Sequence, residues 1–316
     1  MVYRKINRRK AIARKRSSRL LVFLILCLSF ITTFFVANIA DIMNKNTEVV
    51  EETVITGEPP DAIEDKIPDE EEIPEINFQD TINSWVQSVG GSKGILIYDL
   101  DRNEVAGEYN SNQKFETASL YKLFVVYAGY QMLQNGEWQQ NDIVGRTGYT
   151  VLDCLDLAIR ESNSVCAETL WNMIGRTTLN NIIANDFGIN NFDLGDLTAT
   201  PAEITTMMKI FYEHNDITDE DLIQRMEDSF LNQPITEYNW RQGLPSGFSD
   251  KALVYNKVGW NYDGTKWTIY DDAAIVKFAN EERSFIITVM TSGVTYQKIR
   301  SFGSMVEEAF YKTNTY

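Results

Sequence analysis

The sequence predicts an α/β protein of the α+β type, in which an antiparallel sheet is flanked by helices and joined to an all-helical lobe. Strand-like segments occur near both ends of residues 78–316, and helix-like segments fill the middle. One sheet assembled from both ends, with the helical lobe beside it, accommodates that order. A long apolar run lies upstream and predicts one transmembrane helix before the domain.

The first 40 residues have the pattern of a membrane anchor. Residues 1–19 carry nine Lys or Arg and no acid, and the run Leu20–Ala37 has 18 residues without a charge. Basic flanks stay in the cytoplasm, so we expect a cytoplasmic tail (1–19), a single-pass anchor (20–40) in the cell membrane and an extracytoplasmic remainder. A cleavable signal peptide is the alternative, but Phe35 and Asn38 fit a cleavage site poorly.

Residues 41–77 are predicted to be a disordered acidic linker. The segment 41–80 carries fourteen acids against two lysines, and four of the seven prolines lie in 41–76 without an aromatic residue. Such a segment buries too little apolar surface to fold. The net charge of -16 also argues against nucleic acid as a partner, because phosphate binding needs clustered positive charge.

The folded domain is predicted to span residues 78–316, which hold all six tryptophans. Residues 94–100 and 104–109 form the first two strands, joined by an Asp-Arg-Asn turn. Apolar periodicity predicts helices at 119–134, 152–161, 164–174, 177–186, 201–214 and 219–231. Strand patterns return at 252–259, 267–278 and 284–291, and a helix at 296–311 ends the domain.

The histidine content limits the chemistry that the domain can use. His214 is the single histidine, and it lies at the polar end of a helix pattern, where an exposed side chain favoured by the helix dipole is expected. A Ser-His-Asp triad and a zinc site are therefore disfavoured. We expect no metal and no cofactor, and a hydrolase would need Lys, Asp or Glu as its base.

A serine followed three residues later by a lysine provides such a base. The two side chains share one face of a helix, and burial lowers the pKa of the lysine so that it can accept a proton. Ser111 and Ser119 both have this spacing. Ser111 lies in the polar stretch NSNQK, whereas Ser119 begins an apolar helix whose N-terminus favours an oxyanion. We therefore select Ser119 and Lys122.

The later motifs reveal a resemblance to a known family. AIRESNSVCAETLWNMIG follows some forty residues on, and VYNKVGW comes much later. This order resembles the Ser-x-x-Lys, Ser-Asp-Asn and Lys-Thr-Gly signature of class A β-lactamases and penicillin-binding proteins. LTATPAEITTMMKIF and TIYDDAAIVKF are also similar to segments of that superfamily, so the resemblance covers most of residues 90–312. It implies a β-lactamase/transpeptidase-like fold.

The resemblance implies a role for each matching residue. Ser119 is the nucleophile and Lys122 the candidate base. Ser162 relays a proton to the leaving nitrogen, and Lys257 supports that serine and attracts a substrate carboxylate. The backbone N–H groups of Ser119 and Trp260, the residue after Gly259, form the oxyanion hole. Tyr121 is expected in the core or the cleft wall.

Three departures from the family pattern bear on activity. Ser164 replaces the asparagine of the second motif and is shorter, so we expect substrate amide binding that is weaker or mediated by water. Val258 replaces the threonine of the third motif and lacks its hydroxyl group. The Glu-x-x-Leu-Asn loop, whose glutamate activates the deacylating water in the β-lactamases, is missing between Gly175 and Pro201. The acids in that interval that might replace it, each more simply explained as a solvated loop or helix end, are Asp186, Asp193 and Asp196.

Two cysteines flank the second motif. Cys154 and Cys166 should face the oxidising side of the membrane, and a disulfide between them would clamp the Ser162 loop. Two small buried thiols are the alternative.

Three functions remain open. The first is a membrane-anchored serine hydrolase of the β-lactamase type, acylated at Ser119 by β-lactams or by D-Ala-D-Ala-type stem peptides of peptidoglycan. The second is a penicillin-binding, D,D-peptidase-like protein with poor deacylation. The third is a non-catalytic cell-wall-binding module on the same fold. We expect a monomer in each case.

Overall fold

A five-stranded antiparallel sheet forms the centre of the computed structural model, which describes residues 75–190, 192, 194–214, 216–278 and 282–313. The strands lie in the order β2-β1-β7-β6-β5. The sheet therefore combines two strands from the start of the domain with three strands from its C-terminal part. Every neighbouring pair is antiparallel. The strands are β1 (Ser92–Asp99), β2 (Glu104–Tyr109), β5 (Ala252–Tyr262), β6 (Trp267–Phe278) and β7 (Arg283–Ser292).

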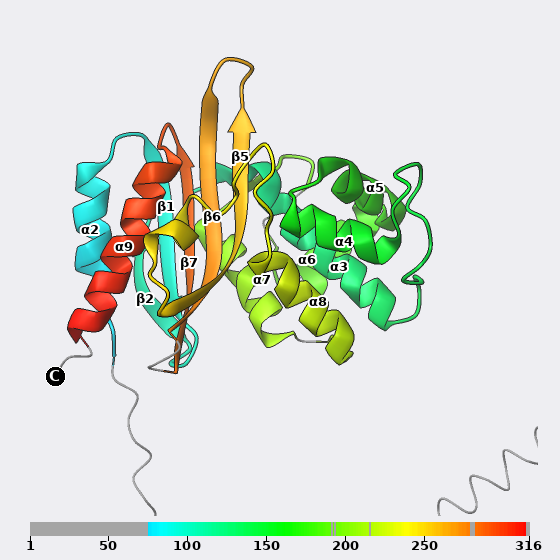
Figure 1. Cartoon of the computed structure of the whole chain (residues 1–316), viewed down its shortest axis with the longest axis horizontal. Helices are drawn as coiled ribbons and strands as arrows, with labels where there is room; N and C mark the ends of the chain where they lie inside the picture. Colours follow the sequence, from blue (N-terminus) through cyan, green and yellow to red (C-terminus); the bar gives the residue numbers. More distant parts are fainter. Residues whose placement is uncertain (1–74, 191, 193, 215, 279–281, 314–316) are drawn as a thin grey trace, which may run out of the picture. The chain divides into compact units, whose positions relative to one another are not determined.

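Helices α2 (Gln79–Ser88) and α9 (Tyr296–Thr313) cover one face of the sheet (Figure 1). Strands β6 and β7 are buried almost throughout, as expected for strands with helices on both faces. Between the sheet and the two helices, Trp85 packs on Phe302 with ring centroids 5.1 Å apart, and Phe278 stacks on Phe310 at 3.8 Å. Burial of these large rings fixes both terminal helices to the sheet.

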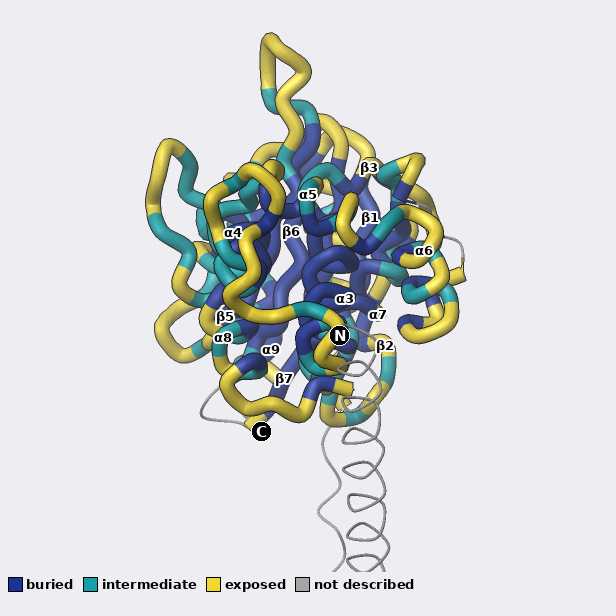
Figure 2. Tube along the Cα trace, turned by 90° about the vertical axis from the view of Figure 1, so that its right-hand side faces the viewer, coloured by how far each residue is buried: buried dark blue, intermediate teal, exposed yellow. Residues whose placement is uncertain are grey.

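The remaining α-helices, α3 to α8, lie on the opposite side of the sheet (Figure 1). Helix α7 (Pro201–Glu213) packs on β7 and begins with a capping box, in which Thr200 and Glu203 satisfy each other's backbone N–H groups. Helix α3 (Lys122–Gln134) runs through the interior of the lobe, and residues 122–130 are all buried (Figure 2). Around α3 lie α4 (Val151–Arg160), α5 (Ser164–Ile174), α6 (Arg176–Asn185) and α8 (Glu220–Leu231).

The strands and helices predicted for the domain are confirmed, with ends that agree within three residues. Strand β5, for example, ends at Tyr262, three residues beyond the predicted 252–259. The prediction omitted α2, the short pair β3 (Phe115–Glu116) and β4 (Thr198–Ala199), and two 3₁₀ turns, η1 (Ala118–Tyr121) and η2 (Leu244–Gly247). The predicted tail, anchor and linker lie outside the described residues apart from the last three linker positions. Within the described part of the chain, no helix is long and apolar enough to cross a membrane.

Candidate active site

Ser119 lies in η1, a tight turn between β3 and α3, rather than in the first turn of an α-helix as the sequence suggested. The turn begins at Ala118, whose φ of 40° is rare for a residue with a side chain. It is held by the backbone N–H of Thr117, which donates to Leu197 O at 2.8 Å. Strained turns of this kind are often found at functional sites.

Gly259 brings strand β5 against this turn. A Cβ atom at Gly259 would lie 2.4 Å from Thr117 O, closer than any carbon can approach. Only glycine therefore lets β5 pass directly behind the serine turn. The sequence motif Lys257-Val258-Gly259 is in this way placed beside Ser119 by packing.

Lys122 is fully buried beneath Ser119 and contacts three hydroxyl groups. Its Nζ atom lies 3.0 Å from Ser119 Oγ, 3.2 Å from Ser162 Oγ and 3.0 Å from Ser164 Oγ, and it also donates to Ser162 O. Burial lowers the pKa of Lys122 to about 7, and the nearby Glu168 opposes that shift. At neutral pH a large fraction of the amine is thus free to accept a proton.

Ser162 connects the two lysines. It has a φ of 55° in the junction between α4 and α5, and its Oγ lies 2.9 Å from Lys257 Nζ as well as 3.2 Å from Lys122 Nζ. Lys257 is buried in β5 and donates a second hydrogen bond to Val258 O at 2.9 Å. Burial lowers the pKa of Lys257 well below its usual value, and the proximity of Lys122 lowers it further.

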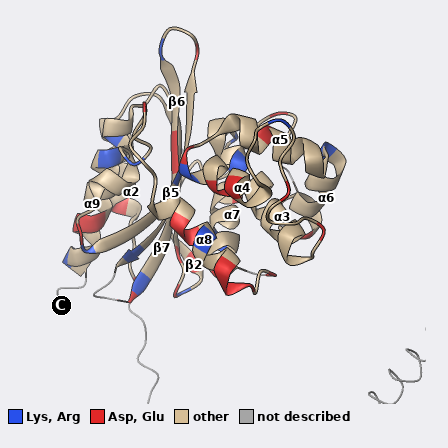
Figure 3. Ribbon diagram, turned by 45° about the vertical axis from the view of Figure 1, so that its right-hand side comes forward, with Lys and Arg blue, Asp and Glu red and all other residues tan. Residues whose placement is uncertain are grey.

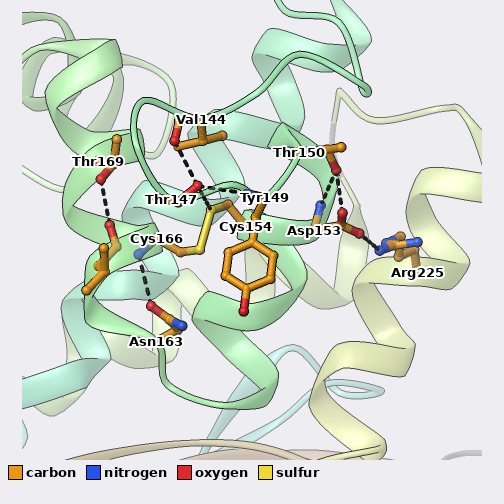
Figure 4. Close-up of a disulfide and its surroundings, with 11 residues drawn as sticks. Val144, Thr147, Tyr149, Thr150, Asp153, Cys154, Asn163, Cys166, Thr169 and Arg225 are labelled. Atoms are coloured by element: carbon orange, nitrogen blue, oxygen red, sulfur yellow. Dashed lines mark hydrogen bonds and ion pairs between the residues drawn. A yellow bond between two sulfur atoms is a disulfide. The ribbon is translucent and has the colours of Figure 1, made fainter.

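The three residues of the second motif, Ser162, Asn163 and Ser164, make different contacts. The Asn163 side chain caps α5 by accepting from Cys166 N at 3.0 Å, so it is a helix cap. Ser164, where the family has asparagine, contacts Lys122 instead. Cys154 and Cys166 form a disulfide that joins α4 to α5 on either side of Ser162, as expected (Figure 4).

Two aspartates lie behind the site in β6, which carries an acidic segment within the sheet (Figure 3). Asp272, paired with Val258, accepts from Leu244 N at 2.8 Å and Asn256 Nδ2 at 2.9 Å, and burial raises its pKa to about 7. Asp271, paired with Gly259, accepts from Thr291 N at 2.7 Å. Burial raises the pKa of Asp271 well above its usual value, which favours the neutral form of this side chain.

An open cleft leads to Ser119. Predicted residues that line it are Ser162, Ser164, Val258 and Trp260. The sequence did not single out the others, which are Glu161, Thr236, Glu237, Tyr238, Trp240 and Trp267. The density of Trp and Tyr between residues 238 and 270 was the one available signal. Loop residues without periodicity gave no indication that they would meet the serine.

The remaining candidates lie elsewhere. Ser111 lies in a turn and donates to Glu108. Tyr121 is buried beside Trp171. His214 ends α7 and is partly buried near Glu227, a correction to the expected exposed position, and burial lowers its pKa. In the described part of the chain no group of His, Cys, Asp or Glu is arranged to hold a metal.

Two of the three candidates for a deacylating acid, Asp186 and Asp196, do not line the cleft. Asp186 is the C-terminal cap of α6, and Asp196 is exposed. Neither lines the cleft, and Asp193 lies outside the described residues. Among the described residues that line the cleft, the acids are Glu161 and Glu237.

On this α+β scaffold, Ser119 and the buried Lys122 are connected through hydrogen bonds to a second serine, Ser162, and a second lysine, Lys257. The Beta-lactamase enzyme family matches residues 77–310, and the chain belongs to that family. No curated protein shows significant sequence similarity to the chain.

Solved structures share the fold at low identity. An ancestral (GNCA) class A β-lactamase is 17% identical and has a TM-score of 0.62, with 74% of this chain and 100% of that chain covered. A β-lactamase from Xanthomonas campestris pv. campestris is 16% identical, with a TM-score of 0.62 and coverages of 74% and 99%. PBP-A is 19% identical, with a TM-score of 0.62 and coverages of 76% and 99%.

Proposed function

We propose that the chain is a membrane-anchored serine hydrolase that is acylated at Ser119 by β-lactams or by D-Ala-D-Ala-type peptides. The observation that carries the proposal is the 3.0 Å contact between Ser119 Oγ and the buried amine of Lys122. Free serine is a weak nucleophile, and an amine with a pKa of about 7 is matched to removing its proton at neutral pH.

The chain of contacts supports a complete acylation step. Ser119 Oγ forms a bond to the carbonyl carbon while its proton moves to Lys122 Nζ. The C–N bond then breaks, and the leaving nitrogen takes a proton from Ser162 Oγ, which lies within hydrogen-bond distance of both lysines. Lys122 returns a proton to Ser162, so that each atom is balanced and the product is an ester on Ser119. The N–H groups of Ser119 and Trp260 are assigned to the oxyanion on the family resemblance.

Deacylation, the release of the acyl group from Ser119, has less structural support than acylation. Hydrolysis needs a base for water. The Glu-x-x-Leu-Asn loop is missing, neither Asp186 nor Asp196 lines the cleft, and the acids that do line it, Glu161 and Glu237, match no residue of that loop. This observation favours the second candidate function, a penicillin-binding, D,D-peptidase-like protein with slow deacylation. The fold similarity to PBP-A is compatible with either function.

Time-resolved intact mass tests the proposal. The full chain, purified in mild detergent, is mixed with a penicillin and sampled from seconds to hours. We expect a covalent adduct with the mass of the intact drug that Ser119→Ala abolishes and Ser111→Ala retains. A persistent adduct identifies the penicillin-binding function, and a transient one with accumulating ring-opened drug identifies a β-lactamase. If neither a β-lactam nor a peptide ester forms an adduct, the proposal is contradicted and a binding module is favoured.

A further inference from the structure

The described residues that line the cleft offer no exposed cation to the carboxylate of a ligand. None of their side chains is Lys or Arg, whereas Glu161 and Glu237 both line the cleft. The two lysines of the site are at most 1% exposed. Lys257 Nζ, which the family resemblance assigns to carboxylate attraction, instead donates to Ser162 Oγ and Val258 O. Val258 has no hydroxyl group with which to bind an anion.

Four aromatic rings form one wall of the same cleft. Tyr238 stacks on Trp240 with centroids 5.0 Å apart, Trp240 meets Trp260 edge-on at 5.3 Å, and Trp267 contacts Tyr238 at 5.5 Å. All four rings line the cleft. The faces of Trp and Tyr carry negative charge density and attract cations, with Trp the strongest.

The aromatic wall of the cleft is hydrogen-bonded to one of the two cleft carboxylates. Tyr238 Oη donates to Glu237 Oε1 at 3.2 Å, which places one carboxylate beside the rings. Glu161 directly precedes Ser162, and its ion pair within the described part of the chain is a 3.7 Å contact with Arg160. Arg160 is closer to Asp156, at 3.0 Å. Both carboxylates therefore keep most of their capacity to attract a ligand cation.

We propose that, among donors of the same acyl group, the cleft prefers one whose departing half carries an amine cation to one whose departing half carries a carboxylate. The proposal rests on the acyl-transfer function above. The departing half is specified because Ser162, which protonates the leaving group in that function, lies next to Glu161 on the cleft lining. The preferred substrate class is a peptide-like amide whose leaving amine belongs to a unit with a second, cationic amine. D-Ala-D-Ala-type peptides and penicillins, which carry a carboxylate on the departing side, then acylate Ser119 more slowly than such a substrate.

A series of thioesters tests the preference directly. Each has the same N-acetyl-D-alanyl acyl group, and the departing thiol is mercaptoacetate (anionic), its amide (neutral) or dimethylaminoethanethiol (cationic). Acylation of Ser119 in the full chain is followed by thiol release and intact mass. Each rate is divided by the rate of the same thioester with hydroxide, so that intrinsic reactivity cancels.

We expect the corrected rate of the cationic thioester to exceed that of the anionic one by at least about tenfold, with the neutral compound between them. Glu237→Gln and Glu161→Gln should each reduce that ratio by about threefold, and added salt should reduce it further. Glu137→Gln is the matched control, because it removes the same charge from an exposed position away from the cleft and should leave the ratio unchanged.

A corrected rate for the cationic thioester that does not exceed that of the anionic one, in a chain that a penicillin acylates, overturns the preference and leaves the acyl-transfer function standing. A ratio that neither Glu237→Gln nor Glu161→Gln changes also overturns it. Absence of any adduct, with penicillin as well as with the thioesters, is the distinct outcome that overturns the acyl-transfer function and this inference together.

Discussion

Lys122 determines how acylation should depend on pH. Burial holds its pKa at about 7, so the fraction of free amine rises from about a tenth at pH 6 to about nine tenths at pH 8. We expect the acylation rate with a penicillin to rise through that interval, and Lys122→Met to lower it by at least about a hundredfold. Stopped-flow rates between pH 5 and 9 check this, and a flat profile would exclude Lys122 as the base.

Asp271 determines a second pH effect, on stability. Its pKa is raised in the folded state, so above pH ~4 the unfolded chain loses a proton that the folded chain keeps. Stability therefore falls as pH rises from the unfolded pKa of this carboxyl toward its folded pKa. The Asn side chain of Asp271→Asn does not titrate, so its stability relative to wild type should increase from pH 4.5 to 7.5 in urea unfolding.

The exposed Asp250→Asn is the control for removing one negative charge. If Asp271→Asn and Asp250→Asn change stability with the same dependence on pH, the raised pKa assigned to Asp271 is wrong.

The residues that contact Lys122 could be predicted from the sequence, because the resemblance of the ordered motifs to the family singles out Ser119, Ser162 and Ser164 without a structure. It could not assign Asn163 to a helix cap, since the same residue type in the same motif fits a ligand role. Tyr238 and Trp240 were also missed, because their loop has no periodicity and only folding brings it to the cleft.

Helices α4 and α5 hold Ser162 in place, and the disulfide between Cys154 and Cys166 joins them (Figure 4). The bridge closes a loop with a sequence separation of 12, for which loop-closure entropy predicts about 3 kcal/mol. We expect Cys154→Ala/Cys166→Ala to lose about that much stability and to slow acylation, because Ser162 has a constrained φ. Thermal unfolding and acylation rates measure the two effects.

A wild-type chain that unfolds identically with and without a reductant, while mass spectrometry shows that the thiols are reduced, would contradict this role.

Among the elements themselves, strong periodicity made helices such as α5 and α7 predictable. Helix α2 was missed because its polar sequence QDTINSWVQS buries only Ile82 and Trp85, too few residues to produce a recognisable stripe.

The molecule as a whole is predicted to consist of a membrane anchor, a linker and the folded domain. The folded part was largely predictable, because strand patterns at both ends of a helical middle admit few arrangements of one sheet.

The predicted anchor is tested by membrane fractionation. The full chain should stay with membranes after carbonate washing, whereas a chain of residues 75–316 should be released. Recovery of the intact full chain in the soluble fraction would contradict the anchor.

The location of the acyl group tests the central claim most directly. The full chain is incubated with a penicillin, digested after reduction, and its peptides are sequenced by tandem mass spectrometry. We predict that the drug mass resides on Ser119 and that Lys122→Met prevents its transfer at neutral pH. An adduct on any other residue, or none under conditions in which the chain is folded, would contradict the account.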